Sequence, residues 1–254
     1  GNIPRQEYLY IETEPGQGYY TWIDYNNNGI KEFNEFEIAI YKDQAAYLRV
    51  ALPNLNFINT QRAKLTQVFT INPSQWSTKK GIKNVISHFY NQTNFSINNE
   101  QERSKNTFNL NPFDIDESKL LGLNFSLRNS LFLNRNLQNY SFIFTYATSK
   151  NKHLYSIGSQ EFNTTLHQLE FLHKLSKFWL FDFTSTASKE SVNTENFTNQ
   201  NYQIDAFEIA PKFTFEYSKN HQFSFLYNFK NKKNTTTSLE TLQQQKVGTS
   251  YYYK

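Results

Sequence analysis

Alternation of apolar and polar residues dominates the chain from about Arg62 onward. In the clearest run, LLGLNFSLRNSLFL, every second position from Leu121 to Leu133 is leucine or phenylalanine except Asn129. A second run, AFEIAPKFTFEY, behaves in the same way over 206–217, and its other positions carry mainly glutamate, lysine and threonine. Because the side chains of a strand point alternately to opposite faces, each run predicts a strand with one apolar and one polar face.

The same pattern predicts about nine strands after Arg62, and the segment AYLRVAL at Ala46 to Leu52 could be one more. The predicted strands are about 9–14 residues long, which exceeds the usual 5–6 and approaches the roughly 9–11 that a tilted membrane-spanning strand needs. Besides the two runs above, they cover Tyr140 to Thr148, Leu166 to Leu175, Trp179 to Ala187, Phe223 to Phe229 and Val247 to Tyr253, with weaker ones at Arg62 to Pro73 and Asn84 to Ile97.

The connections alternate between short links and longer polar stretches. Such alternation is typical of outer-membrane barrels, which have short periplasmic turns and long outer loops. Pro211 interrupts one strand face and requires a bulge or a locally unpaired stretch, because proline has no N–H. The short links are Leu133 to Asn139, Ser176 to Phe178 and Ser218 to His221; the polar stretches are Ser149 to Asn163, Ser188 to Gln203 and Lys230 to Gln245.

We therefore expect an all-β protein: an antiparallel transmembrane β-barrel, or a segment of a larger barrel, with a small N-terminal segment. Residues 1–45 are expected to form that segment and residues 46–254 the barrel strands. The odd strand count and the missing initiator methionine favour a processed or partial chain. A soluble β-sandwich or barrel, with the polar face in solvent, is the alternative.

Composition narrows the choice of class. Hydrophobic residues make up 38% of the chain, below the globular norm of roughly 45–50%. The 24 Phe and 17 Tyr nevertheless exclude a disordered chain, so something other than a thick aliphatic core must hold the strands. The absence of cysteine excludes disulfides and thiolate metal sites. The net charge of +4 is scattered, and we expect no nucleic-acid partner.

The stretch DYNNNGIKEFNE, which begins at Asp24, matches the twelve-residue calcium loop of an EF-hand. Gly29 occupies position 6, where the loop turns sharply, and an oxygen donor fills every ligand position. The predicted ligands of a structural Ca²⁺ are Asp24, Asn26, Asn28, Ile30 through its backbone carbonyl, Glu32 and Glu35. An Asn-Gly turn between two polar strands is the alternative.

Two features separate this loop from a true EF-hand. Lys31 stands at position 8, which is normally aliphatic, and the preceding GYYTWI indicates a strand rather than a helix. Three carboxylates and two asparagines predict weak binding, on the order of 10⁻⁴–10⁻³ M. A short helix could follow in EFEIAIYKDQAAYL, with Asn34 as its N-cap. If the short links face the periplasm, the calcium segment lies on the cell-surface side.

The segment GQGYYTWIDYNNNGIKEFNEFEIAIYKDQAAYLRVALPN, from Gly16 to Asn54, resembles a recurrent block in large, poorly characterised outer-membrane proteins of Bacteroidota. In those proteins the block precedes barrel strands near the C-terminal end, and the chain continues beyond the point where this sequence stops. The resemblance implies the outer membrane of a Gram-negative bacterium and a barrel architecture. It also implies two kinds of partner, the lipid bilayer and other envelope protein subunits.

An enzymatic role is not expected, because no G-x-S-x-G, H-E-x-x-H or phosphate-loop motif occurs. His167 and His173 share a strand face with apolar residues, and Asp182 lies on a polar face. The expected function is an outer-membrane barrel subunit with a structural, transport or scaffold role in a larger envelope assembly. The alternatives are a soluble secreted calcium-binding adhesion module and a barrel hydrolase.

Overall fold

The computed structural model describes residues 2–103, 111–135, 139–155, 158–195, 197, 200–218, 220–236 and 240–253, with side chains for all of these except residues 2–7, 34 and 53–58. The protein is all-β, with 69% strand and 6% helix, as the alternation predicts. Within the described residues, no helix combines the length and the apolar character needed to cross a membrane.

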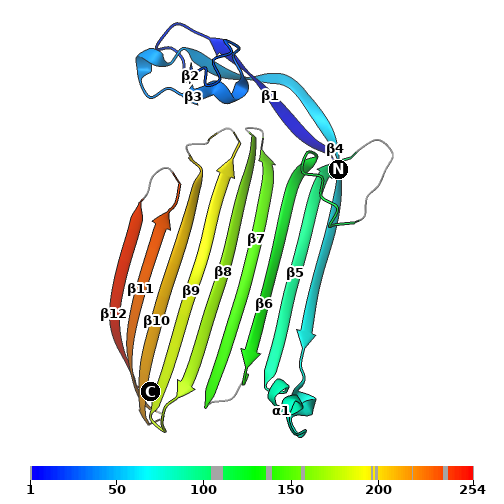
Figure 1. The fold of residues 1–254 in the computed structure, drawn as a ribbon. Helices are drawn as coiled ribbons and strands as arrows, with labels where there is room; N and C mark the ends of the chain where they lie inside the picture. Colours follow the sequence, from blue (N-terminus) through cyan, green and yellow to red (C-terminus); the bar gives the residue numbers. More distant parts are fainter. Residues whose placement is uncertain are drawn as a thin grey trace.

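Nine consecutive strands form one antiparallel meander, in which each strand pairs with the next along the chain (Figure 1). The strand number and the antiparallel order agree with the sequence prediction. The sheet is open, because β12 pairs with β11 alone among the described residues and no closed barrel is formed. The strands are β4 (Tyr47–Ile71), β5 (Phe89–Glu102), β6 (Leu120–Leu133), β7 (Tyr140–Tyr155), β8 (Gly158–Lys174), β9 (Trp179–Thr194), β10 (Tyr202–Ser218), β11 (His221–Asn234) and β12 (Thr241–Tyr253).

The polar stretches that were predicted to be long loops are mostly strand, so that prediction is wrong. Residues 149–155 belong to β7 and residues 158–163 to β8. The stretches 188–203 and 230–245 are divided in the same way between β9 and β10 and between β11 and β12. These parts of the strands are mainly polar on both faces. The alternation of apolar and polar residues is therefore lost, although the backbone hydrogen bonds between the strands continue.

Two further predictions near the N-terminal half are also wrong. Residues 84–88 are not strand, because α1 (Ile82–Ile86) follows the 3₁₀ turn η3 (Ser74–Trp76) and β5 begins only at Phe89. The segment 35–48 contains no α-helix. It forms the end of η1 (Phe33–Glu35), then β3 (Phe36–Ile38), η2 (Lys42–Gln44) and the start of β4.

The N-terminal segment is built on the outer half of β4. The unpredicted strand β1 (Asn2–Glu12) pairs with β4 from Tyr47 to Asn59, and β5 pairs with β4 from Thr60 to Ile71. The short strand β2 (Tyr20–Trp22), which the sequence predicts, pairs with β3. This segment lies at the end of the sheet opposite the strand ends that the short links join, namely Leu133 and Tyr140, Lys174 and Trp179, and Ser218 and His221 (Figure 1).

Apolar side chains gather on one face of the sheet in the half nearer the short links. We call this group the apolar band. Strand by strand it comprises Leu131 and Leu133, then Phe142, Phe144 and Tyr146, then Leu169 and Phe171, then Phe181 and Phe183, then Ile209, Phe213 and Phe215, then Phe223, Phe225 and Phe229, which the ladder places side by side. Beyond the band the same face becomes polar, with Lys150, Asn163, Lys189 and Asp205 in neighbouring positions.

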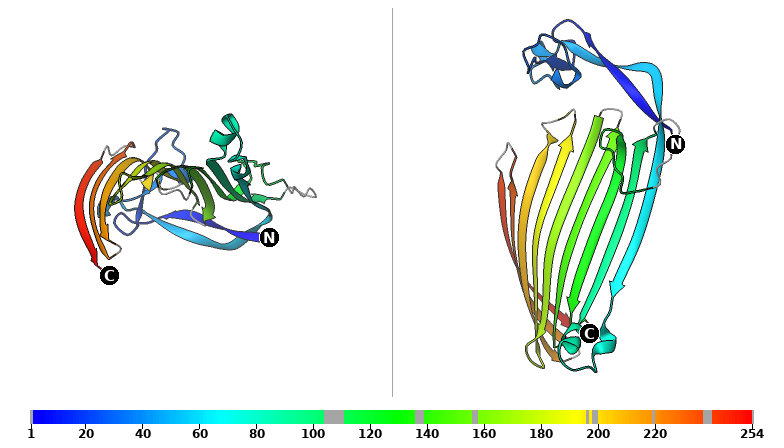
Figure 2. Two further views of the ribbon diagram at one scale, coloured as in Figure 1. Left: turned by 90° about the horizontal axis from the view of Figure 1, so that it is seen from below. Right: turned by 45° about the vertical axis from the view of Figure 1, so that its right-hand side comes forward.

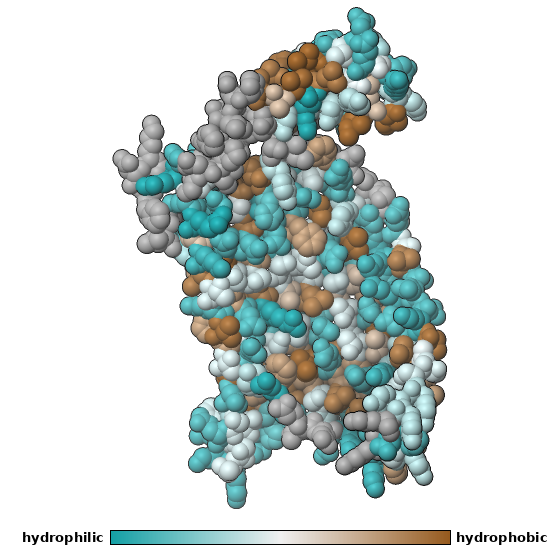
Figure 3. Space-filling view, turned by 180° about the vertical axis from the view of Figure 1, so that it is seen from behind, coloured by the Kyte–Doolittle hydropathy of each residue, from teal (hydrophilic) through white to brown (hydrophobic). Residues whose placement is uncertain are grey.

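The sheet curves into an arch, and residues 111–119 lie on its outer side (Figure 2). These residues cover Ile97, which shares its face with Phe125 and the apolar band. The band therefore lies on the convex face. The opposite, concave face mixes polar and apolar side chains, with polar ones in the majority (Figure 3). Its apolar members include Phe132, Ile143, Leu172 and Leu226. Hydroxyl pairs bridge adjacent strands there: Thr66–Ser96 at 3.1 Å, Ser130–Thr145 at 3.1 Å and Thr214–Ser224 at 3.2 Å.

The buried apolar core is very small for a chain of this size. Among the described residues, the buried hydrophobic side chains are Phe36, Ala45, Tyr47, Ala63 and Ile97, and none of them belongs to β6–β12. The N-terminal segment therefore has a core of its own, in which Tyr10 stacks on Phe36 with ring centroids 3.9 Å apart. The wide sheet of β6–β12 is a single layer.

Pro211 behaves as its chemistry requires. The ladder between β10 and β9 continues through Pro211, which lies opposite Phe183. Between β10 and β11 the pairs stop at Ile209 and resume at Lys212 in the same register. A locally unpaired stretch, rather than a bulge, thus accommodates the missing N–H.

We predict that Gly18→Ala loosens the N-terminal segment. A Cβ on Gly18 would lie 2.6 Å from the carbonyl oxygen of Tyr47 and 2.8 Å from that of Ala45, and Gly18 N donates to Ala45 O at 2.8 Å. We expect a loss of about 1–3 kcal/mol from overpacking, seen as faster proteolysis of residues 1–46. Gly122→Ala is the control, because its nearest neighbours are 3.7 Å away. Equal protection of both variants would contradict the prediction.

Candidate functional site

The loop that begins at Asp24 folds around its own acceptors, between β2 and η1. The Asp24 carboxylate accepts hydrogen bonds from the backbone N–H groups of Asn28 (3.1 Å) and Gly29 (2.8 Å). The side-chain oxygens of Asn26 and Asn28 accept from the backbone N–H two residues further on, at 3.0 and 2.7 Å. Asn27 and Gly29 adopt positive φ angles of 56° and 71°. The stretch that matches an EF-hand loop in sequence therefore folds as a tight turn, in which side-chain oxygens accept hydrogen bonds from the backbone of the loop itself.

Glu35, at position 12 of the loop, is the most buried charged residue that the structure describes. It is 1% exposed, and its Oε2 accepts from Trp22 Nε1 at 2.9 Å and from the backbone N–H of Glu32 at 3.3 Å. Its Oε1 is buried and has no hydrogen-bond partner. A buried carboxylate oxygen without a partner is costly, since it has lost water and gained nothing in return. A cation at this loop would supply the missing partner.

The three carboxylates do not converge in this conformation. Glu32 Oε2 accepts from Asn26 Nδ2 at 2.8 Å, and the oxygens of Asp24 are held by the N–H groups described above. Among the described residues, no three His, Cys, Asp or Glu side chains form a group arranged to hold a metal ion. The structure thus joins Glu32 to Glu35 through the backbone N–H of Glu32. The Asp24 carboxylate is instead bound by backbone N–H groups of the loop.

Lys31 points away from the loop and ties it to β1 and β4. Its Nζ lies 2.8 Å from the carboxylate of Glu12 and 5.0 Å from the ring centroid of Tyr47. The hydrogen bond to Glu12, followed by one to Tyr47, raises the pKa of Lys31 above its usual value. Position 8 is occupied by lysine here because it faces an acidic and aromatic surface instead of the interior of a helix–loop–helix pair.

The donor set suits calcium better than a softer metal. Ca²⁺ prefers carboxylate, carboxamide and carbonyl oxygens, and it takes the last glutamate of such a loop through both oxygens. Glu35 has one oxygen already oriented by Trp22 and one without a partner. Asp24, Asn26, Asn28, Ile30 and Glu32 are the other residues that would hold the ion. The sequence pattern did not reveal the role of Trp22, which is set by the pairing of β2 with β3.

The groups considered for hydrolysis are separated by the sheet. His167 and His173 lie on the convex face, where His167 packs 5.0 Å from Tyr146 between ring centroids. Asp182 is opposite Leu172 and Lys212, on the concave face. His153 lies in β7 near the end of the sheet that carries the N-terminal segment, whereas Asp182 lies in β9 near the opposite end. These residues cannot combine into one Ser–His–Asp arrangement.

Comparison of the chain with protein-family models, with curated proteins and with solved structures gives no match. The assignment of the loop and of the two faces therefore depends on their residues and geometry.

We predict that Trp22→Phe destabilises the N-terminal segment. The replacement keeps the aromatic ring but removes the Nε1–H that Glu35 Oε2 accepts, so the buried carboxylate loses a donor. The expected loss is about 1–3 kcal/mol in the free energy of unfolding, measured by chemical denaturation in a calcium chelator. Trp76→Phe, outside this segment, serves as the control. An unchanged midpoint for Trp22→Phe would show that the hydrogen bond is not formed in solution.

Proposed function

We propose that the chain forms part of the wall of an outer-membrane β-barrel in a Gram-negative bacterium. The observation that carries the proposal is the distribution of side chains on a single curved sheet, with an apolar band on the convex face and mainly polar residues on the concave face. Transmembrane barrels have this arrangement, with lipid outside and a wet lumen inside.

In the described part of the chain, no second layer of protein covers the apolar band. Apolar side chains of the band remain partly exposed, among them Phe144 (37%), Phe213 (40%) and Phe225 (44%). Soluble proteins bury such a face against a second layer of helices or strands, and large exposed apolar patches mark interaction surfaces. A lipid bilayer supplies that second layer without further protein, because hydrocarbon chains can cover a continuous curved face.

The height of the band supports the same proposal. Together with flanking residues of the same face, Trp179 and Ala187 on β9 and Phe207 on β10, the band spans about nine residues of each of these strands, which matches the roughly 9–11 residues of a tilted membrane-spanning strand. Beyond it, β7–β12 continue with polar residues on both faces. We place the short links in the periplasm and these polar extensions, with the N-terminal segment, on the cell-surface side.

The concave face would line an aqueous space. Glu208 forms an ion pair with Lys230 at 3.3 Å and accepts from Asn228 Nδ2 at 2.6 Å, so part of its charge is neutralised across the β10–β11 ladder. The remaining charges of this face include Arg128, Asp182, Lys212 and Glu216. A polar wall of this kind fits a structural, transport or scaffold role within a larger envelope assembly, and no catalytic group is assigned to it.

The open edge of the sheet agrees with a role in a larger wall. The outer side of β12 presents backbone donors and acceptors that no described strand pairs. Backbone groups in a membrane must be satisfied by strand pairing, so further strands are required at this edge. Other envelope subunits, or other parts of a barrel, are the proposed partners.

We also propose that Ca²⁺ stabilises the N-terminal segment through the loop at Asp24. The buried Oε1 of Glu35 supports this role, because a cation would offset the cost of its desolvation. The site would be structural. It would hold the loop in one turn next to Lys31 and Glu12, beside the first strand of the wall.

The membrane placement can be tested with single cysteines, since the native chain has none. Ser185 lies on the convex face within the apolar band, and its neighbour Thr184 lies on the concave face. We expect a nitroxide on Ser185→Cys in proteoliposomes to be accessible to oxygen, and one on Thr184→Cys to be accessible to a water-soluble nickel chelate. A label at 185 that is shielded from both, or a chain that stays soluble without detergent, would favour a soluble module instead.

The calcium proposal predicts a metal-dependent melting temperature. We expect millimolar Ca²⁺ to stabilise the N-terminal segment, by about 1.4 kcal/mol at a concentration tenfold above the dissociation constant. Glu35→Gln should abolish the effect, because the amide keeps the shape but removes the charge. Glu14→Gln, which alters an exposed carboxylate outside the loop, is the control. A calcium response that Glu35→Gln retains would contradict the assignment.

A further inference from the structure

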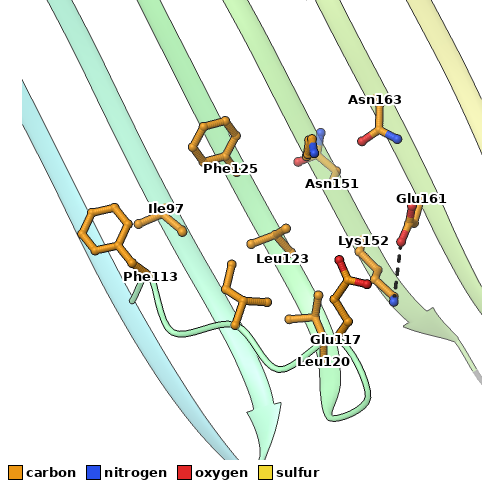
Figure 4. A pocket seen from close by; sticks show the side chains of 12 residues that line it. Ile97, Phe113, Glu117, Leu120, Leu123, Phe125, Asn151, Lys152, Glu161 and Asn163 are labelled. Carbon is orange, nitrogen blue, oxygen red and sulfur yellow. Dashed lines mark ion pairs between the residues drawn. The ribbon is translucent and has the colours of Figure 1, made fainter. Parts of the chain in front are cut away.

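A cavity of about 410 Å³ opens on the convex face, beyond the apolar band (Figure 4). Ile97, Leu123 and Phe125 form its floor on β5 and β6, and Ile97 is only 3% exposed. Phe113 and Ile115, from the segment that links β5 to β6, form its other wall. The volume lies in the range of roughly 300–1,000 Å³ that is usual for small-molecule sites.

The wall of the cavity is fixed by buried amides. Asn99, which is 2% exposed, donates through Nδ2 to the carbonyl of Pro112 at 2.7 Å. Gln101 donates through Nε2 to the carbonyl of Asp114 at 2.9 Å and accepts from the backbone N–H of Asp116 at 3.1 Å. These hydrogen bonds hold residues 111–116 against β5. The cavity is therefore a built feature of the face rather than a gap beneath a loose loop.

The mouth of the cavity is charged. Lys150 and Lys152 enter it from β7, and Lys152 forms an ion pair with Glu161 at 3.5 Å. Lys150 lies on the same face and is exposed, and no carboxylate of the described residues comes within ion-pair distance of it. Glu117 borders the cavity from the linking segment (Figure 4). One cation is thus left without a counter-ion beside an apolar chamber.

The position of the cavity relates this cation to the membrane proposed above. On β7 the band ends with Phe144 and Tyr146, and Lys150 follows on the same face after Thr148. About four residues of strand separate Tyr146 from Lys150, so the ammonium group lies at the level where a bilayer changes from hydrocarbon to headgroups. Lysine side chains at this level attract phosphate-bearing lipids.

We propose that the cavity binds one acyl chain of a membrane lipid whose headgroup carries a phosphate, with the phosphate on Lys150. The chain would lie against Leu123 and Phe125, and the phosphate would neutralise the unpaired ammonium. The proposal rests on the membrane placement of the convex face. The site would hold one particular lipid at the cell-surface side of the barrel wall. This lipid would be distinct from the lipids that cover the apolar band as a whole.

The test is native mass spectrometry of the whole chain in dodecyl maltoside micelles, titrated with dioleoyl phosphatidylglycerol. We expect one saturable lipid adduct per chain. Lys150→Gln should weaken it about five- to tenfold, since one charged contact is lost. Lys189→Gln should leave it unchanged, because Lys189 lies on the same face outside the cavity and faces Asp205 at 3.7 Å. Dioleoylglycerol, which has the same chains without phosphate, should bind Lys150→Gln and the native chain equally weakly.

Three results would overturn the proposal: adducts that do not saturate, equal affinity of the native chain and Lys150→Gln for phosphatidylglycerol, or equally tight binding of glycerol phosphate alone. Leu123→Trp, which fills the chamber, provides a second variant and should reduce lipid binding without altering the charge. Binding in micelles does not require insertion into a bilayer. A failure here, with nitroxide accessibilities as predicted, would remove the lipid site and leave the membrane wall in place.

Discussion

An antiparallel sheet of one layer can pair the hydrogen-bonding groups of its backbone, but it cannot bury its apolar side chains. Ladder hydrogen bonds complete the polar groups of β5–β11 within the sheet, whereas nothing in the described chain covers the phenylalanines of the apolar band. The usual solution in soluble domains, a second layer of protein, is absent from the described residues, and the few buried hydrophobic side chains lie between Phe36 and Ile97. The function depends on this constraint, because whatever covers the convex face determines where the protein works.

The two ends of the strands meet different demands. Near the short links, one face needs an apolar neighbour and the other, mainly polar face needs water. Towards the N-terminal segment, β7–β10 are mainly polar on both faces, and the apolar side chains at this end are those of the cavity on β5 and β6. The cavity at Lys150 and the loop at Asp24 both belong to the polar end, where specific contacts can be made without competition from a continuous hydrocarbon surface.

The strands that carry the apolar band could be predicted from the sequence, because each places phenylalanine or leucine at alternate positions. Their polar halves could not, since a stretch such as 149–155 has no contrast between its faces and only the ladder reveals it as strand. The residues of the loop at Asp24 could be identified from their spacing. The contact of Trp22 with Glu35 depends on the pairing of β2 with β3, which spacing within the loop does not encode. The curvature of the sheet could not be predicted from the sequence either, because it depends on the tertiary structure.

The continuity of β4 has a mechanical consequence. One strand of 25 residues carries the N-terminal segment on its outer half and the first ladder of the sheet on its inner half. The hydrogen bonds of an antiparallel ladder lie across the strand direction. A pull on the N-terminal segment along β4 would therefore load the pairs between Thr60 and Ile71 together, in shear, instead of opening them one after another. The attachment of the N-terminal segment to the sheet therefore resists tension along β4.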